Sequence, residues 1–218
     1  MSPVAPVIPA AELRPVGRTV LLVIDIQGTG SAADTEPGLA FMATRSERIA
    51  GSLALVHAFR EKSLPVIFVQ EVHKPSLIDI GRELDGAEGP HALENDPATA
   101  LYPGFEPLPE EYLVRKRRYS AFFGSDLDLI LRGYGAETIV MVGAMSDVCV
   151  HYTAVDAHQL DYRFRTVGDL VFGSSDEAHE AALHAMKYLQ RDGVVSAEAV
   201  HRWLAEFASE QPRLTPNH

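Results

Sequence analysis

The sequence has a single cysteine, Cys149, among its 218 residues. One cysteine excludes a disulfide framework within the chain and any zinc site built from several cysteines. Basic residues are also scarce: 19 Lys and Arg stand against 30 Asp and Glu, and the formal net charge is -11. Nucleic-acid phosphates attract a basic surface, so we expect no nucleic-acid partner.

Long apolar runs are missing as well. No stretch has the roughly 20 apolar residues that a membrane-spanning helix requires. The first residues, MSPVAPVIPAAELRP, lack the basic region followed by an apolar core that marks a secretory signal. We therefore expect no membrane partner and a cytoplasmic location. The overall composition, 46% hydrophobic and 22% charged, is that of an ordinary globular domain with a sizeable core.

The chain alternates predicted strands and helices. Strands are expected at 19–27, 65–70, 112–114, 139–142, 163–167 and 194–195, and helices at 45–62, 125–134, 147–159, 176–190 and 197–207. This alternation predicts an α/β fold with three α-β-α layers around a mainly parallel, about six-stranded, Rossmann-like sheet. No linker marks a second domain, so residues 17–211 are expected to form one domain. Residues 1–16, with four prolines, are expected to form an extended arm.

Helical spacing also predicts which faces of two helices are apolar. The predicted apolar residues are Val148, Tyr152 and Val155 in the helix at 147–159, and Ala181, His184, Ala185 and Tyr188 in the helix at 176–190. Residues 71–111 show no sustained periodicity. A loop of that length in a compact domain is usually functional, often a lid or a specificity region.

Cys149 falls in the first turn of the helix that comes after the strand at 139–142. Free N–H groups and the helix dipole at that position favour a thiolate, or an anion forming on a substrate. A small cysteine buried between helix and sheet is the competing interpretation, because free cysteine is among the most buried residue types. Asp25 and Lys116 come at the ends of two other predicted strands. An acid, a lysine and a cysteine at one sheet edge favour an active site.

Three segments carry a family resemblance: VIDIQ (23–27), VRKRRYSAFFGSDLDLIL (114–131) and VGAMSDVCV (142–150). They resemble the isochorismatase-like cysteine hydrolases, which include nicotinamidases, N-carbamoylsarcosine amidases, biuret hydrolases and ureidoacrylate amidohydrolases. The resemblance extends from about residue 18 to residue 196.

By this resemblance, Asp25 is the general acid/base, Lys116 the catalytic lysine and Cys149 the nucleophile. A cis peptide bond not involving proline is implied between Ala144 and Met145. The N–H groups of Met145 and Cys149 are implied to form the oxyanion hole.

The activity that the resemblance implies is hydrolysis of a C–N bond in a small amide or ureide through a thioester, with release of ammonia or an amine. No cofactor is implied, and family members form dimers or tetramers. Two alternatives stay open: a metal-dependent nicotinamidase, and a catalytically silent member that serves as a binding or scaffold protein. A vinyl ether hydrolase of the isochorismate type is less expected, because such members generally lack the cysteine.

The predicted substrate-binding residues are Gln27, Glu71, His73, Tyr119 and Phe122. Arg82 or Arg118 is a candidate partner for a substrate carboxylate. The segment KRRYS is closer to ureidoacrylate amidohydrolases than to biuret hydrolases. Linear ureides, carboxylated amides, lactams and aromatic amides all remain open as substrates.

A metal site is the open question. Glu71, His73 and His91 stand roughly where nicotinamidases place the acid and histidines that hold a divalent ion. The family uses aspartate where this chain has Glu71, and the flanking aromatic and cysteine residues are absent. We therefore expect no metal, with Glu71 and His73 lining the pocket or pairing with Arg82 or Arg118.

Overall fold

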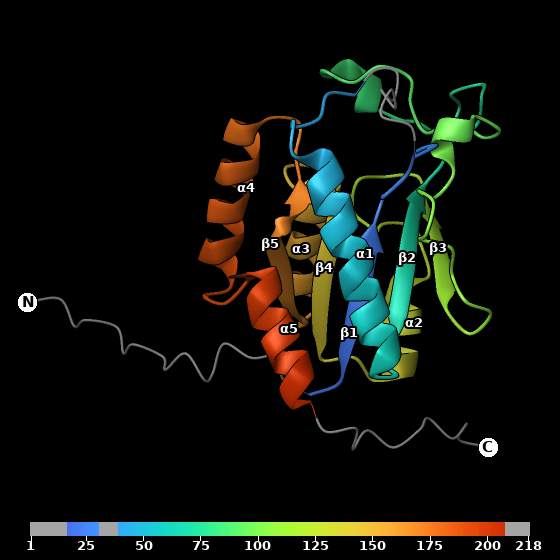
Figure 1. The fold of residues 1–218 in the computed structure, drawn as a ribbon. Coiled ribbons are helices and arrows are strands. Elements are labelled where there is room, and N and C mark those ends of the chain that lie inside the picture. Colours follow the sequence, from blue (N-terminus) through green and yellow to red (C-terminus); the bar gives the residue numbers. More distant parts are fainter. Residues whose placement is uncertain (1–16, 31–38, 208–218) are drawn as a thin grey trace, which may run out of the picture.

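The computed structural model describes residues 17–30 and 39–207 (Figure 1). The strands are β1 (Thr19–Ile24), β2 (Val66–Glu71), β3 (Tyr112–Lys116), β4 (Thr138–Ala144), β5 (Arg163–Phe172) and β6 (Val194–Val195). The α-helices are α1 (Arg45–Glu61), α2 (Leu127–Tyr134), α3 (Cys149–Gln159), α4 (Asp176–Leu189) and α5 (Ala197–Glu206). Two short 3-10 helices, η2 (Glu83–Asp85) and η3 (Pro97–Thr99), lie between β2 and β3. The predicted arm at 1–16 and the end of the predicted domain, 208–211, lie outside the described residues.

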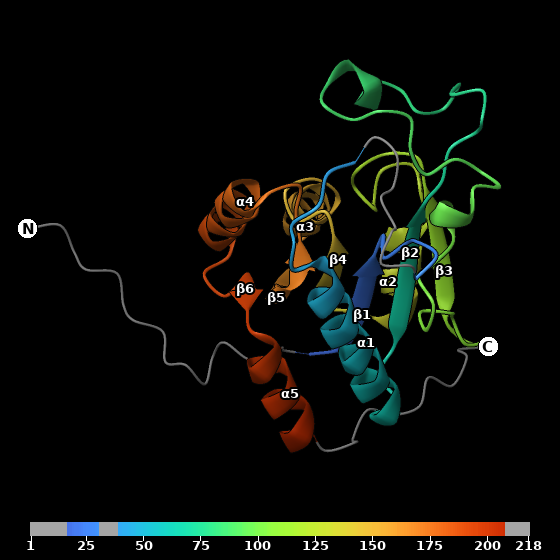
Figure 2. The same ribbon diagram turned by 45° about the horizontal axis from the view of Figure 1, so that its top comes forward.

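All six strands are parallel, in the order β3-β2-β1-β4-β5-β6. Helices α1 and α5 cover one face of the sheet, and α2, α3 and α4 cover the other (Figures 1 and 2). The predicted three-layer α/β fold with about six strands is confirmed. No described helix combines the length and apolar character needed to span a bilayer.

Strand β1 shows why a continuous apolar run predicts a central strand of a parallel sheet. All six of its residues are buried. Val20, Leu22 and Ile24 face the core under α2, α3 and α4, while Leu21 and Val23 face the core under α1 and α5. A central strand of a parallel sheet is covered on both sides, so it reads as a continuous apolar run. Each of these side chains contributes roughly 1.5–3 kcal/mol by its burial.

The predicted apolar faces of two helices are wrong. Helix α3 buries Cys149, Val150, Thr153, Ala154 and Ala157, and α4 buries His179, Ala182, Leu183 and Met186. Tyr152 is 50% exposed and Tyr188 is 90% exposed. In both helices the buried face is turned by one position, because packing on the sheet selects it: Cys149 and Thr153 of α3, and Ala182 and Met186 of α4, each follow a predicted residue. The Tyr152 ring instead stacks on Tyr119, with 5.7 Å between the ring centroids.

The carboxyl ends of the central strands are set by two unusual backbone positions. Strand β1 ends three residues earlier than predicted, because Asp25 has a φ of 48°. Gly143 in β4 has a φ of 116°, and a Cβ there would lie 1.9 Å from the carbonyl oxygen of Ile24. Only glycine permits this approach of β4 to β1. The two strand ends that flank the candidate site are thus held close together.

Candidate active site

Asp25, Lys116 and Cys149 meet at the carboxyl edge of the sheet. Asp25 comes directly after β1, Lys116 is the last residue of β3, and Cys149 begins α3 just beyond β4. Lys116 Nζ lies 2.9 Å from Asp25 Oδ2 and 3.4 Å from Cys149 Sγ. Parallel strands bring their carboxyl ends to one edge, where ligands of open α/β sheets bind. The structure thus brings together the three residues predicted to be catalytic.

Glu71 completes this group. It is the last residue of β2 and is the register partner of Lys116 in the neighbouring strand. Its Oε2 forms an ion pair with Lys116 Nζ and lies 3.5 Å from Cys149 Sγ. Lys116 therefore donates hydrogen bonds to Glu71 and Cys149 and forms an ion pair with Asp25. The sequence predicted a substrate-binding role for Glu71, and the structure places it in contact with the predicted catalytic residues.

The charges of these buried groups depend on one another. Burial raises the pKa of Asp25 to about 6, although Lys116 opposes the rise. Burial acts in the same direction on Glu71, but Lys116 and the hydrogen bonds from His73 and His91 outweigh it and hold its pKa well below the usual range. Burial alone would lower the pKa of Lys116, but Asp25, Cys149 and Glu71 raise it well above its usual value. Lys116 is therefore a permanent cation, and Asp25 titrates nearest neutrality.

The resting form of Cys149 is a thiol. Burial raises its pKa well above the usual value; Lys116 opposes the rise, and the nearby carboxylates of Glu71 and Asp25 add to it. The sequence pattern favoured a thiolate because Cys149 stands at a helix N-terminus. Burial and two carboxylates outweigh that effect. A base must therefore remove the thiol proton, and carboxylate oxygens of both Asp25 and Glu71 lie within 4.8 Å of the sulfur.

The turn before Cys149 contains the cis peptide bond that the resemblance implies, between Ala144 and Met145. The Ser146 N–H donates to Phe172 O over 2.8 Å, and Ser146 Oγ lies 2.8 Å from His179 Nδ1. Among the described residues, no backbone oxygen accepts from the amide N–H of Met145 or of Cys149. Both groups are available for the predicted oxyanion hole.

Gln27 lies on the pocket wall, but its side-chain amide is engaged elsewhere. Nε2 donates to Glu71 O over 3.0 Å and to Thr99 O over 2.8 Å, and Oε1 accepts from the Glu71 N–H over 3.0 Å. These bonds fasten the end of β2, which carries Glu71. Gln27 thus holds Glu71 in position and has no spare N–H for a substrate.

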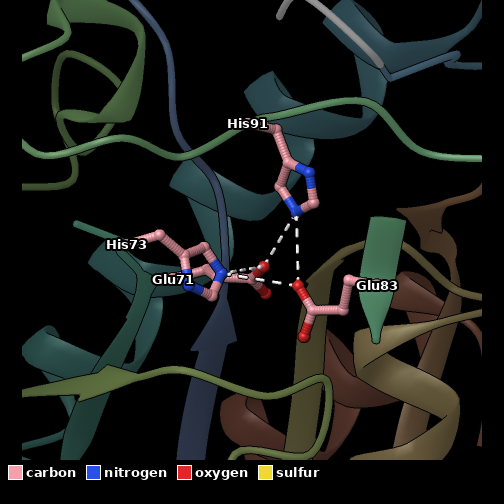
Figure 3. Close-up of side chains that lie close together, drawn as sticks. All are labelled: Glu71, His73, Glu83 and His91. Carbon is pink, nitrogen blue, oxygen red and sulfur yellow. Dashed lines mark hydrogen bonds and ion pairs between the residues drawn. The ribbon is translucent and has the colours of Figure 1, made fainter. Parts of the chain in front are cut away.

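A second cluster lies beside Glu71. His73 Nε2 is 3.1 Å and His91 Nε2 is 3.0 Å from Glu71 Oε1. The same two nitrogens lie 3.4 Å and 3.7 Å from Glu83 Oε2. Figure 3 shows the His91 ring and the Glu83 carboxylate turned toward His73 and Glu71. A bridge between His73 and Leu93 folds the segment back and brings His91 to this place.

This cluster can hold a divalent metal ion. Its four ligand atoms lie within 4.8 Å of one another. Two imidazoles and two carboxylates suit zinc, iron or manganese. The Glu83 carboxylate is buried and makes no hydrogen bond within the described ranges. The residues therefore fit a metal. The sequence prediction missed Glu83 because its segment has no periodic pattern.

Without a metal ion, the same four side chains form a network in which opposite charges balance. Burial alone would lower the pKa of His73, but Glu71 and Glu83 raise it to about 9. Burial likewise opposes the rise for His91, where Glu71 and the Gly89 carbonyl raise the pKa to about 9. Two imidazolium ions then balance the carboxylates.

The predicted arginine partners of this region are wrong. Arg82 is exposed and pairs with Asp85 at 2.8 Å. Arg118 donates to Asp79 O over 2.6 Å. Neither contacts Glu71, whose ion pair with Lys116 takes that place.

A pocket with about 380 Å³ of empty space, partly open to solvent, lies over Cys149. Its polar wall includes Asp25, Gln27, Glu71, Glu88, His91 and Tyr119, and its apolar wall includes Leu39, Phe41, Ala92, Ala144 and Met145. Two predicted substrate-binding residues lie elsewhere. His73 is fully buried behind Glu71, and Phe122 stacks on Tyr162 with 6.0 Å between the centroids.

Comparison with known proteins places these observations in a family. The family model described as "Isochorismatase domain" matches residues 19–199. YwoC of Bacillus subtilis, described as an isochorismatase family protein, is 47% identical over 73 residues, which are 34% of this chain and 39% of YwoC. Ureidoacrylate amidohydrolase RutB of Pseudomonas syringae is 28% identical over 186 residues, covering 77% of this chain and 76% of RutB.

A solved structure shows the same similarity. The N-carbamoylsarcosine amidase from Thermoplasma acidophilum superposes with a TM-score of 0.68 at 25% identity, covering 84% of this chain and 98% of the amidase. The family match spans most of the chain and includes all six strands of the sheet. The chain therefore belongs to the isochorismatase family.

Proposed function

We propose that this protein is a cysteine hydrolase that cleaves a C–N bond of a small amide or ureide through a thioester acyl-enzyme. The observation that carries this proposal is the position of Lys116 Nζ, in contact with both the Asp25 carboxylate and the Cys149 thiol at the floor of a pocket. Two similar proteins bear the names amidohydrolase and amidase, which supports hydrolysis of a C–N bond.

In the first half of the reaction, Asp25 takes the proton from the Cys149 thiol, and the sulfur attacks the substrate carbonyl carbon. The carbonyl oxygen becomes an oxyanion that accepts hydrogen bonds from the amides of Met145 and Cys149. Loss of one such donor costs about 10²–10³ in turnover. Asp25 then gives its proton to the leaving nitrogen, and ammonia or an amine departs.

In the second half, Asp25 takes a proton from a water molecule, and the resulting hydroxide attacks the thioester. The C–S bond breaks, the acid product forms, and the proton returns to the Cys149 sulfur. Lys116 stays charged throughout and stabilises whichever neighbour is anionic.

A silent scaffold is the weaker alternative. Burying an ion costs several kcal/mol even after relaxation, and a buried pair often does no better than an apolar replacement. Glu71 lines the pocket and Lys116 is buried in contact with it. A protein that only binds partners elsewhere on its surface has no physical need for this arrangement.

The proposal is tested by ammonia release from a panel of small amides and ureides, followed by mass spectrometry of a mixture quenched in turnover. The acyl group is expected on Cys149, and assignment is direct because the chain has no other cysteine. An acyl group on any other residue would contradict the thioester mechanism.

The pKa of Asp25 predicts a pH profile. Asp25 must be ionised to accept the thiol proton, and its pKa is raised to about 6. We expect kcat/KM to fall about tenfold per pH unit below about pH 6 and to level off above it. Measurement of kcat/KM from about pH 5 to pH 8 checks this, with Asp25→Asn as the control that loses the acidic limb. A flat wild-type profile over that range would rule out Asp25 as the base.

A metal-dependent hydrolase is a second candidate, favoured by the Glu71, His73, Glu83 and His91 cluster. An ion held by these residues would supply a Lewis acid that polarises a bound water or substrate atom at the pocket wall. Lys116 engages only Oε2 of Glu71, which leaves Oε1 for the ion.

Metal analysis separates the two candidates. The metal-dependent candidate predicts about one equivalent of divalent ion in purified protein, and loss of both ion and activity on chelation. It also predicts that Glu83→Gln weakens ion binding by roughly 10–100-fold or more. If activity is unchanged after exhaustive chelation, the metal-dependent candidate is excluded and the metal-free hydrolase stands. The matched control is Glu94→Gln, because Glu94 pairs with Lys74 on the surface.

We also propose that the protein acts as a homo-oligomer, a dimer or a tetramer, as its family resemblance implies. Sedimentation velocity checks this, and a monomer at the concentrations used in the activity assay would contradict it.

A further inference from the structure

The hydrogen-bond donors around the pocket are already engaged. Lys116 donates hydrogen bonds to Glu71 and Cys149 and forms an ion pair with Asp25. His91 contacts Glu71 through Nε2 and the Gly89 carbonyl through Nδ1, at 3.0 Å and 2.7 Å. A carboxylate on a substrate therefore finds no free cation among the described residues that line this pocket.

Acceptors, in contrast, are free. Tyr119 donates its hydroxyl to Glu88 Oε2 over 3.0 Å, which fixes the Glu88 carboxylate on the pocket wall. Within residues 17–30 and 39–207, Glu88 Oε1 receives no hydrogen bond. Asp25 Oδ1 is buried and also lacks a hydrogen-bond partner there. The pocket wall thus carries two carboxylates, Asp25 beside the nucleophile and Glu88 farther along, and Glu88 Oε1 is the oxygen that we expect to meet the occupant.

Nearby arginines do not alter this balance. Arg82 and Arg118 pair outside the pocket. The Arg45 guanidinium lies 4.9 Å from the centre of the Phe41 ring and donates to Gln27 O over 3.0 Å, and Arg45 is not among the residues that line the pocket. Residues 31–38, outside the described part of the chain, contain two acidic residues and no Lys, Arg or His.

We propose that Glu88 is a specificity-determining residue, and that the pocket selects amides and ureides that carry no carboxylate and offer an N–H to Glu88 Oε1. This inference rests on the proposed function and narrows its substrate class. A carboxylated substrate would place a like charge beside Glu88, and the nearest cation, His91 at 3.9 Å from Glu88 Oε2, is already paired with Glu71 at 3.0 Å. A neutral or cationic amide instead gains a hydrogen bond. Carboxylated amides, which the sequence left open, are thereby disfavoured.

A pair of thiol reagents tests the inference without knowledge of the substrate. Iodoacetamide and iodoacetate have nearly the same size, and each alkylates a thiolate with loss of iodide, but only iodoacetate is anionic. The rates of Cys149 modification are followed by mass spectrometry and divided by the rates for free cysteine. We expect this normalised rate to be roughly 10–100-fold lower for iodoacetate. The preference is expected with and without chelator.

Two substitutions test whether Glu88 causes the slower reaction with iodoacetate. Glu88→Gln keeps the shape and removes the charge, and it is expected to recover about tenfold of the iodoacetate rate. Asp85→Asn is the matched control: it lies three residues away, its side chain is 61% exposed, and it pairs with Arg82. It is expected to leave the ratio of the two reagents unchanged. The inference would be overturned if the wild-type protein had the same ratio of iodoacetamide to iodoacetate rates as free cysteine. It would also be overturned if Glu88→Gln left this ratio unchanged.

The outcomes separate this inference from the proposed function. If neither reagent modifies Cys149, the cysteine does not face the pocket as a nucleophile and both fail. If both reagents modify Cys149 equally and ammonia release still requires Cys149, the hydrolase stands and the selectivity is wrong. N-carbamoylglycine and its amide repeat the comparison in turnover, where the amide is expected to have the higher kcat/KM.

Discussion

Replacement of Cys149 with alanine is expected to lower kcat/KM by about 10⁴-fold or more, the loss typical of removing a nucleophile. The reason is that no other described side chain at the pocket floor can form the acyl-enzyme: Asp25 and Glu71 are held by Lys116. The fold is expected to survive, because the substitution removes one atom from a buried site and relieves a contact between the thiol and two carboxylates.

Val150→Ala is the matched control. Val150 is the next residue of α3 and is fully buried in the same core. Its truncation is expected to cost roughly 2 kcal/mol of unfolding free energy and to leave kcat/KM nearly unchanged. If Cys149 is the nucleophile, steady-state kinetics show a large loss of kcat/KM only for Cys149→Ala, and urea unfolding shows a loss of stability mainly for Val150→Ala. Full activity in Cys149→Ala would end the thioester proposal.

Replacement of Lys116 with methionine is expected to reduce both stability and turnover. Lys116 is 1% exposed and is the only described cation in contact with Asp25 and with Oε2 of Glu71. Removing one partner of a buried ionic group leaves uncompensated charge and costs about 3–5 kcal/mol. Turnover is expected to fall as well, because the charge that stabilises the anionic forms of Asp25 and Cys149 is lost.

The loss of stability in Lys116→Met is expected to depend on pH in one direction. Without Lys116, the pKa of Asp25 is expected to rise further above its unfolded value, and the pKa of Glu71 loses the largest of the effects that hold it low. The folded state then binds more protons, so stability decreases as pH rises from the unfolded pKa through the folded pKa. The cost of Lys116→Met is therefore expected to be larger near pH 8 than near pH 5, as measured by urea unfolding at several pH values.

A surface lysine provides the comparison for this experiment. Lys74 is 52% exposed and pairs with Glu94 at 2.7 Å. Lys74→Met is expected to change the unfolding free energy by less than about 1 kcal/mol, because exposed ion pairs contribute little. A Lys116→Met protein that is as stable as Lys74→Met at every pH would show that the buried charges do not depend on Lys116.

The order of strands and helices can be predicted from the sequence alone. Runs such as Leu21 to Ile24 and Ile139 to Val142 are apolar at every position because helices cover both faces of the sheet. Alternation with amphipathic segments then leaves a parallel sheet as the consistent arrangement. Asp25, Lys116 and Cys149 could be located in the same way, because each lies at or shortly after the end of a predicted strand.

Tertiary structure alone decided the surroundings of these residues. Glu83 and Glu88 come from a segment without periodicity, and their positions depend on the bridge of His73 to Leu93 and on the hydroxyl of Tyr119. The role of Gln27 depends on its distance from the backbone of Glu71, 44 residues along the chain. Local patterns record which side chains are buried and where a strand ends. Contacts between segments far apart in sequence leave no local pattern, so the charge of the pocket, on which the proposed selectivity depends, appears only in the folded chain.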